Sequence, residues 1–266
     1  MAIFKGAGVA IVTPMYEDGK VNYDKLEELL EYQIANSTDA IIICGTTGES
    51  STMTHGEHLK TIKFAIDKVN KRVPVIAGTG SNCTETAIMM SKEAASYGAD
   101  ALLIVTPYYN KATQKGLIAH YTAIAEAVPE IPVLLYNNPG RVGYTLSADL
   151  VEKLAHEVKN IVGMKDTSGD ITQTEEFIRR NADVGFKVFG GKDTLLYASL
   201  CIGAVGGVCT AGNFMPELIV DIYNKYVAGD LKGSLAAQYK LNPVRLAMDG
   251  ASFPVAAKDM AIMRGQ

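Results

Sequence analysis

The most constraining feature of this sequence is an alternation, repeated eight times, between short β-branched runs and segments with helical periodicity. Such alternation is typical of parallel βα units. Apolar residues recur at three- and four-residue spacing after the runs, for example over residues 22–36, 55–70 and 115–128. The strand-like runs cover residues 9–14, 40–45, 74–80, 101–107, 132–139, 161–167, 186–191 and 205–213.

Eight βα units in 266 residues fit a (β/α)8 TIM barrel, whose usual length is about 250 residues. An open doubly wound sheet is the main alternative, but it usually carries G-x-G-x-x-G after its first strand, where this chain has "VTPMYEDGK". We therefore predict an α/β fold with a (β/α)8 catalytic barrel over residues 1–229. Two helical stretches in residues 230–266 predict a short C-terminal helical appendage, and its missing stop signal indicates a curtailed end.

Composition narrows the classes of partner. The net charge of -4 and the absence of a basic run argue against a nucleic-acid partner. The four cysteines are scattered without a C-x-x-C pair, so we expect neither a disulfide framework nor a zinc knuckle. No stretch reaches the roughly 20 apolar residues of a membrane-spanning helix. We therefore expect a cytoplasmic protein in a reducing compartment, with no membrane partner.

Polar residues gather where the predicted strands end, which is the end of a (β/α)8 barrel that holds the active site. Lys165 lies near the end of the run "IVGMKDT". Side-chain alternation predicts that Val162 and Met164 face the helices, whereas Ile161 and Lys165 face the interior. An amine that burial keeps uncharged attacks carbonyl groups and forms a Schiff base. The alternatives are an ion pair with Asp166 and a lysine that extends to solvent from the strand end.

The run "PVLLYNNPGR" adds two candidates at the same end. Tyr136 shares a face with Leu134 and Asn138, and its phenol is suited to moving protons during imine formation. The alternative is that Tyr136 is a structural residue that caps the core of the barrel. Arg141, in the following turn, has a planar guanidinium that suits a carboxylate, although a solvated loop arginine is the simpler interpretation.

The loop "GTTGES" offers backbone amides and the hydroxyls of Thr46 and Thr47, a combination that suits a small anion. A tight turn with a helix cap is the alternative. His55 and His58 are three residues apart but do not form H-E-x-x-H, so we expect no metal. The tyrosine pair of "TPYYNK" is most often a feature of an exposed loop or an interface.

Together, "GTTGES", "TPYYNK", "YNNPGR", "GMKDTSGD" and the "GG" after the seventh run resemble the dihydrodipicolinate synthase and N-acetylneuraminate lyase family of barrel aldolases. The match extends along nearly the whole chain. The doubled threonine, paired tyrosine and arginine resemble the synthase branch, which condenses pyruvate with L-aspartate 4-semialdehyde to 4-hydroxy-tetrahydrodipicolinate on the route to diaminopimelate and lysine. The alternatives are a lyase that releases pyruvate from N-acetylneuraminate or a 2-keto-3-deoxy sugar acid, and a non-catalytic barrel that senses a keto acid or an amino acid.

The resemblance implies a role for each matching residue. Lys165 would form the imine with pyruvate and Tyr136 would shuttle protons. Thr47 would link that phenol to Tyr109, which would reach across from a neighbouring subunit. Arg141 would bind the carboxylate of the semialdehyde. The substrate-binding set would be Thr46, Thr47, Arg141, Gly191 and Val208.

The resemblance also implies an assembly and a regulatory site. No cofactor is expected, and the family habit is a homotetramer built as paired dimers. Three residues depart from the family pattern: Thr86 stands where an acid would hold a lysine ammonium, Asn138 replaces a small apolar residue, and Lys192 replaces an acid. The residues that match the family's lysine-binding regulatory site are Ser50, Ser51, His55, His58, Asn82 and Tyr108.

Overall fold

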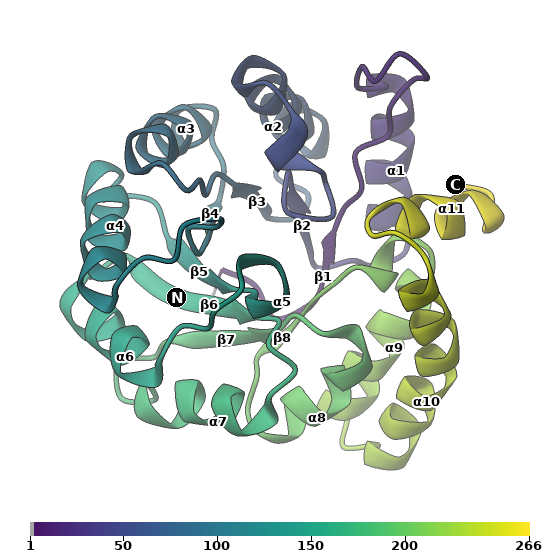
Figure 1. Cartoon of the computed structure of the whole chain (residues 1–266). Helices are drawn as coiled ribbons and strands as arrows, with labels where there is room; N and C mark the ends of the chain where they lie inside the picture. The colour runs from purple at the N-terminus through teal and green to yellow at the C-terminus, as the bar shows by residue number, and fades with distance from the viewer. Residues whose placement is uncertain (1–2) are drawn as a thin grey trace.

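The structure of the chain, a computed structural model, describes residues 3–266 and is built on eight parallel strands. Each strand pairs with the next in sequence order, and β8 pairs with β1, which closes the barrel (Figure 1). The predicted (β/α)8 fold is confirmed. The strands are β1 (Gly6–Ala10), β2 (Ala40–Ile43), β3 (Val75–Gly78), β4 (Ala101–Val105), β5 (Val133–Asn137), β6 (Ile161–Asp166), β7 (Lys187–Gly190) and β8 (Gly206–Cys209).

Helices follow the strands and form a ring around them (Figure 1). Short polar side chains cap the N-termini of several helices. Asn22 accepts a hydrogen bond from the amide of Lys25, and Ser147 accepts one from the amide of Leu150. These contacts satisfy amides that a first helical turn leaves free. The helices are α1 (Tyr23–Ala35), α2 (His55–Val69), α3 (Thr84–Ser96), α4 (Gln114–Ala127), α5 (Pro139–Val142), α6 (Ala148–Glu157), α7 (Ile171–Arg180), α8 (Leu196–Cys201), α9 (Pro216–Val227), α10 (Leu231–Ala247) and α11 (Val255–Met263).

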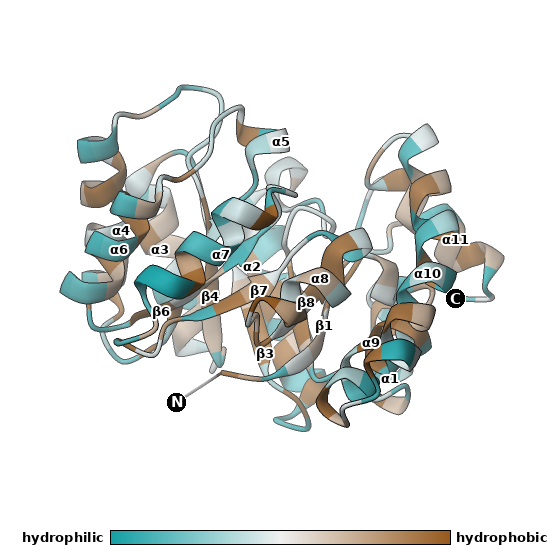
Figure 2. Ribbon diagram, turned by 90° about the horizontal axis from the view of Figure 1, so that it is seen from below, coloured by the Kyte–Doolittle hydropathy of each residue, from teal (hydrophilic) through white to brown (hydrophobic). Residues whose placement is uncertain are grey.

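Apolar side chains fill both sides of the strand ring. In the interior, Ile42, Ile76 and Leu103 pack together, and Phe4 stacks on Phe189 with 4.4 Å between ring centroids. A second and larger cluster lies between the strands and the helices. Figure 2 shows the resulting contrast between hydrophobic strands and hydrophilic outer helices such as α7. The interior is therefore a packed core, as is usual for this type of barrel.

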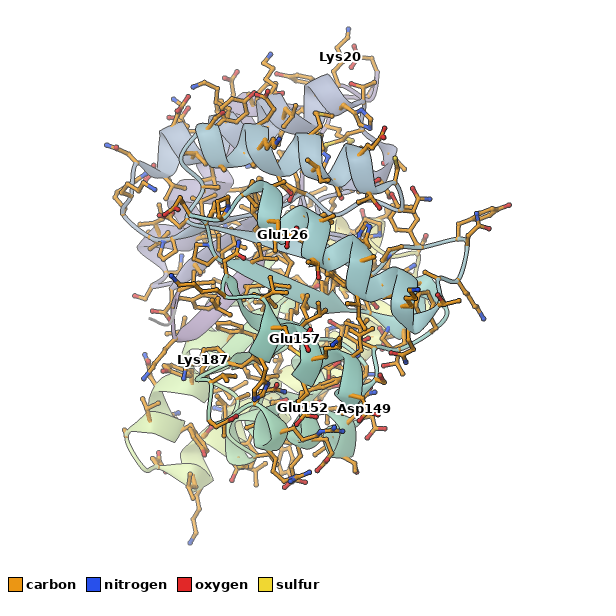
Figure 3. All side chains as sticks on the ribbon, turned by 90° about the vertical axis from the view of Figure 1, so that its left-hand side faces the viewer. Lys20, Glu126, Asp149, Glu152, Glu157 and Lys187 are labelled. Carbon is orange, nitrogen blue, oxygen red and sulfur yellow. The ribbon has the colours of Figure 1, made fainter. Side chains whose placement is uncertain are left out.

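Charged side chains cover the outward faces of the helices (Figure 3). On α6, Asp149 and Glu152 both pair with Arg180 of α7, while Glu157 pairs with Lys153 at 2.6 Å. Ion pairs in such exposed positions contribute little to stability. These charged side chains keep the outer faces of the helices in contact with water. The candidate catalytic residues lie at the other side of the strands.

The first strand lies upstream of its predicted range, at Gly6–Ala10 instead of 9–14. Beyond Ala10, the amide of Val12 donates to the side chain of Asn213 instead of to a neighbouring strand. Glycine is uncommon in strands, so the sequence pattern misses the true start. Packing explains the glycine: a Cβ on Gly8 would lie 3.0 Å from the ring of Phe4.

Other predicted runs extend past the strands that the structure contains. Residues 132–139 shorten to Val133–Asn137 because α5 begins at Pro139, directly after Asn138. Residues 205–213 shorten to Gly206–Cys209 because their end becomes the short helix η3 (Ala211–Asn213). The residues cut from these runs form the polar loops at the carboxyl end of the barrel.

Strand β6 contains a bulge that changes the predicted side-chain directions. Val133 of β5 pairs with Ile161, but the next residue of β5, Leu134, pairs with Gly163. Ile161 therefore packs with Met164 in the outer cluster, whereas Val162 packs against the interior, opposite to both expectations. Regular alternation resumes after the bulge. Lys165 lies after the bulge, so its side chain is directed inward, as predicted.

Helix α10 packs beside α9 after Gly229 (Figure 1). It is joined to the barrel through Asp193, a carboxylate buried where β7 ends. The Nε of Arg245 in α10 donates to this carboxylate at 3.1 Å, and the amides of Thr210 and Ala211, after β8, donate at 3.0 and 2.8 Å. A carboxylate taken out of water needs partners of this kind. The network therefore fixes α10 to the loops at the carboxyl ends of β7 and β8.

Candidate active site

Lys165 projects into the barrel interior from the end of β6. Its neighbours across the ladder are Tyr136 of β5 and Phe189 of β7. Only 5% of Lys165 is exposed, and its Nζ lies 4.5 Å from the centroid of the Tyr136 ring. The Lys165 amine is therefore enclosed by the barrel interior and lies beside the Tyr136 ring.

Asp166 does not act as the ion-pair partner that the sequence left open for Lys165. Its carboxylate accepts hydrogen bonds from Asn137 Nδ2 at 2.9 Å, Ser168 Oγ at 2.9 Å and Thr174 Oγ1 at 2.5 Å. These partners lie on the helix side of the strand. Asp166 therefore stabilises the β6–α7 connection, and the amine stays directed inward.

Tyr136 is buried beside Lys165, and its phenol oxygen accepts a hydrogen bond from Asn138 Nδ2 at 2.9 Å. Burial alone would raise the pKa of this phenol. The charge of Lys165, together with the hydroxyls of Thr46 and Thr167, more than offsets burial, so the pKa of Tyr136 lies below its ordinary value. A phenol that ionises more easily is a better proton carrier near neutral pH.

The structure gives the two threonines different places from those implied by the resemblance. Thr46 is the threonine that stabilises the Tyr136 phenolate, whereas the hydroxyl of Thr47 lies 3.2 Å from that of Thr210. The resemblance gave Thr47 a link to the phenol, but the contact that the Thr47 hydroxyl makes in the single chain is with Thr210. Tyr109 is 91% exposed in the single chain, with a φ of 73° that is rare for a bulky residue.

Gly191 and Val208 are part of the surroundings of Lys165. Val208 of β8 packs in the interior cluster that contains Tyr136. Gly191 follows β7, and its amide donates to the carbonyl of Asp166 at 2.7 Å. A Cβ on Gly191 would collide with the Thr167 hydroxyl and lie 3.0 Å from Lys165 Cε. The absence of a side chain at residue 191 thus makes room for the lysine stem.

We expect Gly191→Ala to slow imine formation by about 100-fold, because a displacement of roughly 1 Å at a reacting group has an effect of that size. The added methyl must push either Thr167 or the lysine stem aside. The rate at which pyruvate is trapped on the protein by reduction measures this effect. Gly250→Ala is the matched control, since a Cβ there meets nothing within 4 Å. Equal trapping rates in both variants would contradict this account.

A cavity of about 520 Å³ opens beside the loop that contains Thr46, and neither Lys165 nor Tyr136 is among its lining residues. Arg141 lines it, and the guanidinium carbon lies 4.9 Å from the centroid of the Phe253 ring, which comes from the C-terminal segment. Thr46 lines the same cavity and also stabilises the Tyr136 phenolate. Thr46 is therefore the residue that the cavity wall and the surroundings of the Tyr136 phenol share.

Most of the residues matched to a regulatory site line this same cavity. They are Ser50, Ser51, His55, His58 and Tyr108, with Thr86 beside them, while Asn82 is not among the lining residues. His58 Nε2 contacts the carbonyl of Gly78 at 2.8 Å, and burial lowers the pKa of His58 to about 4. His58 is therefore neutral at physiological pH and cannot supply a positive charge to a ligand.

Two polar residues beside the reactive pair had no role in the sequence interpretation. The Thr167 hydroxyl helps to lower the pKa of Tyr136, and Asn138 Nδ2 donates to the Tyr136 phenol oxygen. Strand alternation could have predicted both positions, because residues two apart in a strand share a face. Thr167 is two residues after Lys165, and Asn138 is two residues after Tyr136.

Two further properties concern residues 3–266 as a whole. Within this range, no group of three or more histidine, cysteine or acidic side chains is arranged to hold a metal ion. The helices described there include none with the length and apolar character needed to cross a membrane.

Comparison with known proteins gives a consistent result. The family model described as the dihydrodipicolinate synthetase family matches residues 3–265. The 4-hydroxy-tetrahydrodipicolinate synthase of Lachnoclostridium phytofermentans is 51% identical over 265 residues, which cover 100% of this chain and 90% of that protein.

Solved structures agree with the sequence comparison. The dihydrodipicolinate synthase of Bacillus anthracis superposes with a TM-score of 0.95 at 38% identity, covering 100% of this chain and 90% of that one. The enzyme of Acinetobacter baumannii, solved in complex with pyruvate, has a TM-score of 0.91 at 42% identity, covering 96% and 86% of the two chains. The chain therefore belongs to the dihydrodipicolinate synthetase family, as its motifs indicated.

Proposed function

We propose that this chain is a Schiff-base-forming synthase that condenses pyruvate with L-aspartate 4-semialdehyde to 4-hydroxy-tetrahydrodipicolinate. The observation that carries the proposal is the buried amine of Lys165, directed into the barrel 4.5 Å from the ring of Tyr136. Its similarity over the whole chain to proteins named for this reaction supports the choice of substrates.

In the proposed reaction, the uncharged amine of Lys165 attacks the ketone carbon of pyruvate. The phenol of Tyr136 donates a proton to the resulting hydroxyl, which leaves as water, and a protonated imine forms. The phenolate then removes a proton from the methyl carbon to give an enamine. That carbon adds to the aldehyde, and the aldehyde oxygen takes the proton that Tyr136 holds, which gives a hydroxyl. The amino group of the semialdehyde then displaces Lys165 from the imine carbon, which closes the ring and frees the lysine amine. The imine itself is the electron sink, so the reaction needs no cofactor.

Two groups would hold the carboxylates. The loop that contains Thr46 and Thr47 offers hydroxyls and backbone amides to the carboxylate of pyruvate. Arg141 lines the same cavity as Thr46, where its planar guanidinium suits the carboxylate of the semialdehyde. This second group distinguishes the proposed aldehyde from polyhydroxylated aldehydes, which need no such partner.

We also propose that the chain works as a homotetramer of paired dimers in which Tyr109 reaches a neighbouring subunit. An aromatic side chain that is almost fully exposed on a left-handed residue is costly unless a partner uses it. Sedimentation at the mass of four chains would support this assembly. Sedimentation at the mass of one chain, with full activity, would contradict it.

Turnover with different aldehydes tests the proposed function. The purified protein is incubated with pyruvate and either L-aspartate 4-semialdehyde, N-acetylmannosamine or the aldehyde of a keto-sugar acid. We expect efficient condensation only with the semialdehyde. Indifference to the semialdehyde, combined with cleavage or condensation of a sugar substrate, would identify the chain as a lyase instead.

We expect Arg141→Ala to weaken use of the semialdehyde by about 10- to 100-fold, since a charge-assisted contact to a carboxylate contributes about 1.5–3 kcal/mol. Pyruvate imine formation should stay close to that of the unmodified protein. Steady-state kinetics with the semialdehyde, and reductive trapping with pyruvate alone, measure the two steps separately. Lys111→Ala, which changes an exposed lysine, is the control. Equal losses in both steps would refute the role of Arg141.

A further inference from the structure

Asn138 occupies the position before helix α5 where asparagine normally caps a helix, yet its side chain makes no capping bond. Corresponding residues elsewhere in the chain do cap: Asn22, Thr54 and Ser147 each accept a hydrogen bond from an amide in the first helical turn. The Asn138 side chain is instead directed back to the strand, where its Nδ2 donates to the Tyr136 phenol oxygen at 2.9 Å.

The surroundings of Asn138 make this bond effective. Only 7% of the residue is exposed, so water does not compete for the amide. Its backbone carbonyl accepts hydrogen bonds from the amides of Arg141 and Val142 at 3.0 and 3.1 Å, which fixes the residue in the turn. A buried donor that is held on a fixed backbone loses little entropy when it binds its acceptor.

The bond acts on the group that moves protons in the proposed reaction. A donor to the phenol oxygen stabilises the phenolate more than the phenol, because the oxygen then carries a full charge. The other groups near this oxygen are Lys165 from β6 and the hydroxyls of Thr46 and Thr167. Among neighbouring charged groups, Asp166 faces α7 and Arg141 lies against Phe253. Lys165 must already be uncharged when its amine attacks the ketone, whereas the Asn138 amide still donates to the phenol oxygen at that stage.

We propose that Asn138 is a positioning residue for Tyr136, which orients the phenol toward Lys165 and keeps it ready to release its proton while the amine is uncharged. This proposal rests on the proposed function, since it requires Tyr136 to carry protons in imine formation. The proposal also explains why an asparagine stands at residue 138, where the family usually has a small apolar residue.

The experiment measures how the rate of pyruvate trapping depends on pH. Pyruvate and cyanoborohydride are added to the full-length protein, and mass spectrometry follows the reduced adduct. One limb of the profile, meaning one pH range over which the trapping rate changes, should be absent in Tyr136→Phe. That limb is assigned to ionisation of the Tyr136 phenol. For Asn138→Leu we expect this limb to move up by about half to one pH unit, since a neutral hydrogen bond has this effect. Asn138→Asp should move it further in the same direction, because a carboxylate repels the phenolate.

Ser147→Ala is the matched control. It removes a bond that does cap a helix, so it should lower the melting temperature and leave the pH profile unchanged. If Asn138 were merely structural, its variants would behave in the same way, and such a result would overturn the proposal. Should Asn138→Leu fail to fold, Asn138→Asp decides alone. Failure of the unmodified protein to trap pyruvate would instead reject the proposed function.

Discussion

Lys165→Met is expected to abolish covalent trapping of pyruvate and to reduce synthase turnover to the background rate. Methionine has a similar length and no amine, so it removes the nucleophile without leaving a cavity. Replacement of a buried charge by an apolar group is often neutral or stabilising, and we expect the melting temperature to stay level or rise. Mass spectrometry after borohydride reduction, together with thermal unfolding, measures both effects.

Lys187→Met is the matched control for this experiment. Lys187 begins β7, the strand next to β6, but at the opposite end of the barrel from the polar loops (Figure 3). This variant should be trapped as efficiently as the unmodified protein. An adduct that survives Lys165→Met, or that disappears with Lys187→Met, would show that the reactive amine has been assigned incorrectly.

Tyr136→Phe is expected to slow imine formation by about 100-fold or more, the usual contribution of a positioned acid–base group. The phenyl ring fills the same space in the interior cluster, so pyruvate should still reach the site. The apparent KM for pyruvate should change much less than the maximal trapping rate, because the lost interaction belongs to the transition state.

Tyr121→Phe provides the comparison. Tyr121 is also fully buried, and its hydroxyl donates to Thr106 Oγ1 at 3.3 Å, but it lies on the helix side of the strands. Loss of this hydroxyl should lower the free energy of unfolding by about 1 kcal/mol without an effect on trapping. If both variants lost stability alone, Tyr136 would be a core residue and not a proton carrier.

The alternation of runs was sufficient to predict the fold, because parallel βα units leave few other ways to bury so many β-branched residues. The inward direction of Lys165 was also correct. The argument behind it was only partly right, since the bulge in β6 reverses Ile161 and Val162. A bulge depends on how two strands pair across the ladder, and a single run of sequence carries no record of that pairing.

The details of the site depend on contacts between residues far apart in the sequence. The adjacent residues Thr46 and Thr47 cannot be distinguished by motif, and only the folded loop directs the first to Tyr136 and the second to Thr210. Asn138 was recognised as unusual, but its contact with the phenol depends on the turn into α5. The residue types were therefore sufficient to predict the kind of chemistry. The structure was needed to identify which residue each reactive group contacts.

The buried carboxylate of Asp193 has a consequence for how the chain can be divided. A barrel cut at Gly229 would keep this acid and the amides of Thr210 and Ala211, but it would lose the guanidinium of Arg245. A buried negative charge without its positive partner is strongly destabilising, and here it would lie directly behind the loop that contacts Thr47. Helix α10 thus supports the loops at the carboxyl ends of β7 and β8, and we expect a barrel cut at residue 229 to be less stable than the full chain.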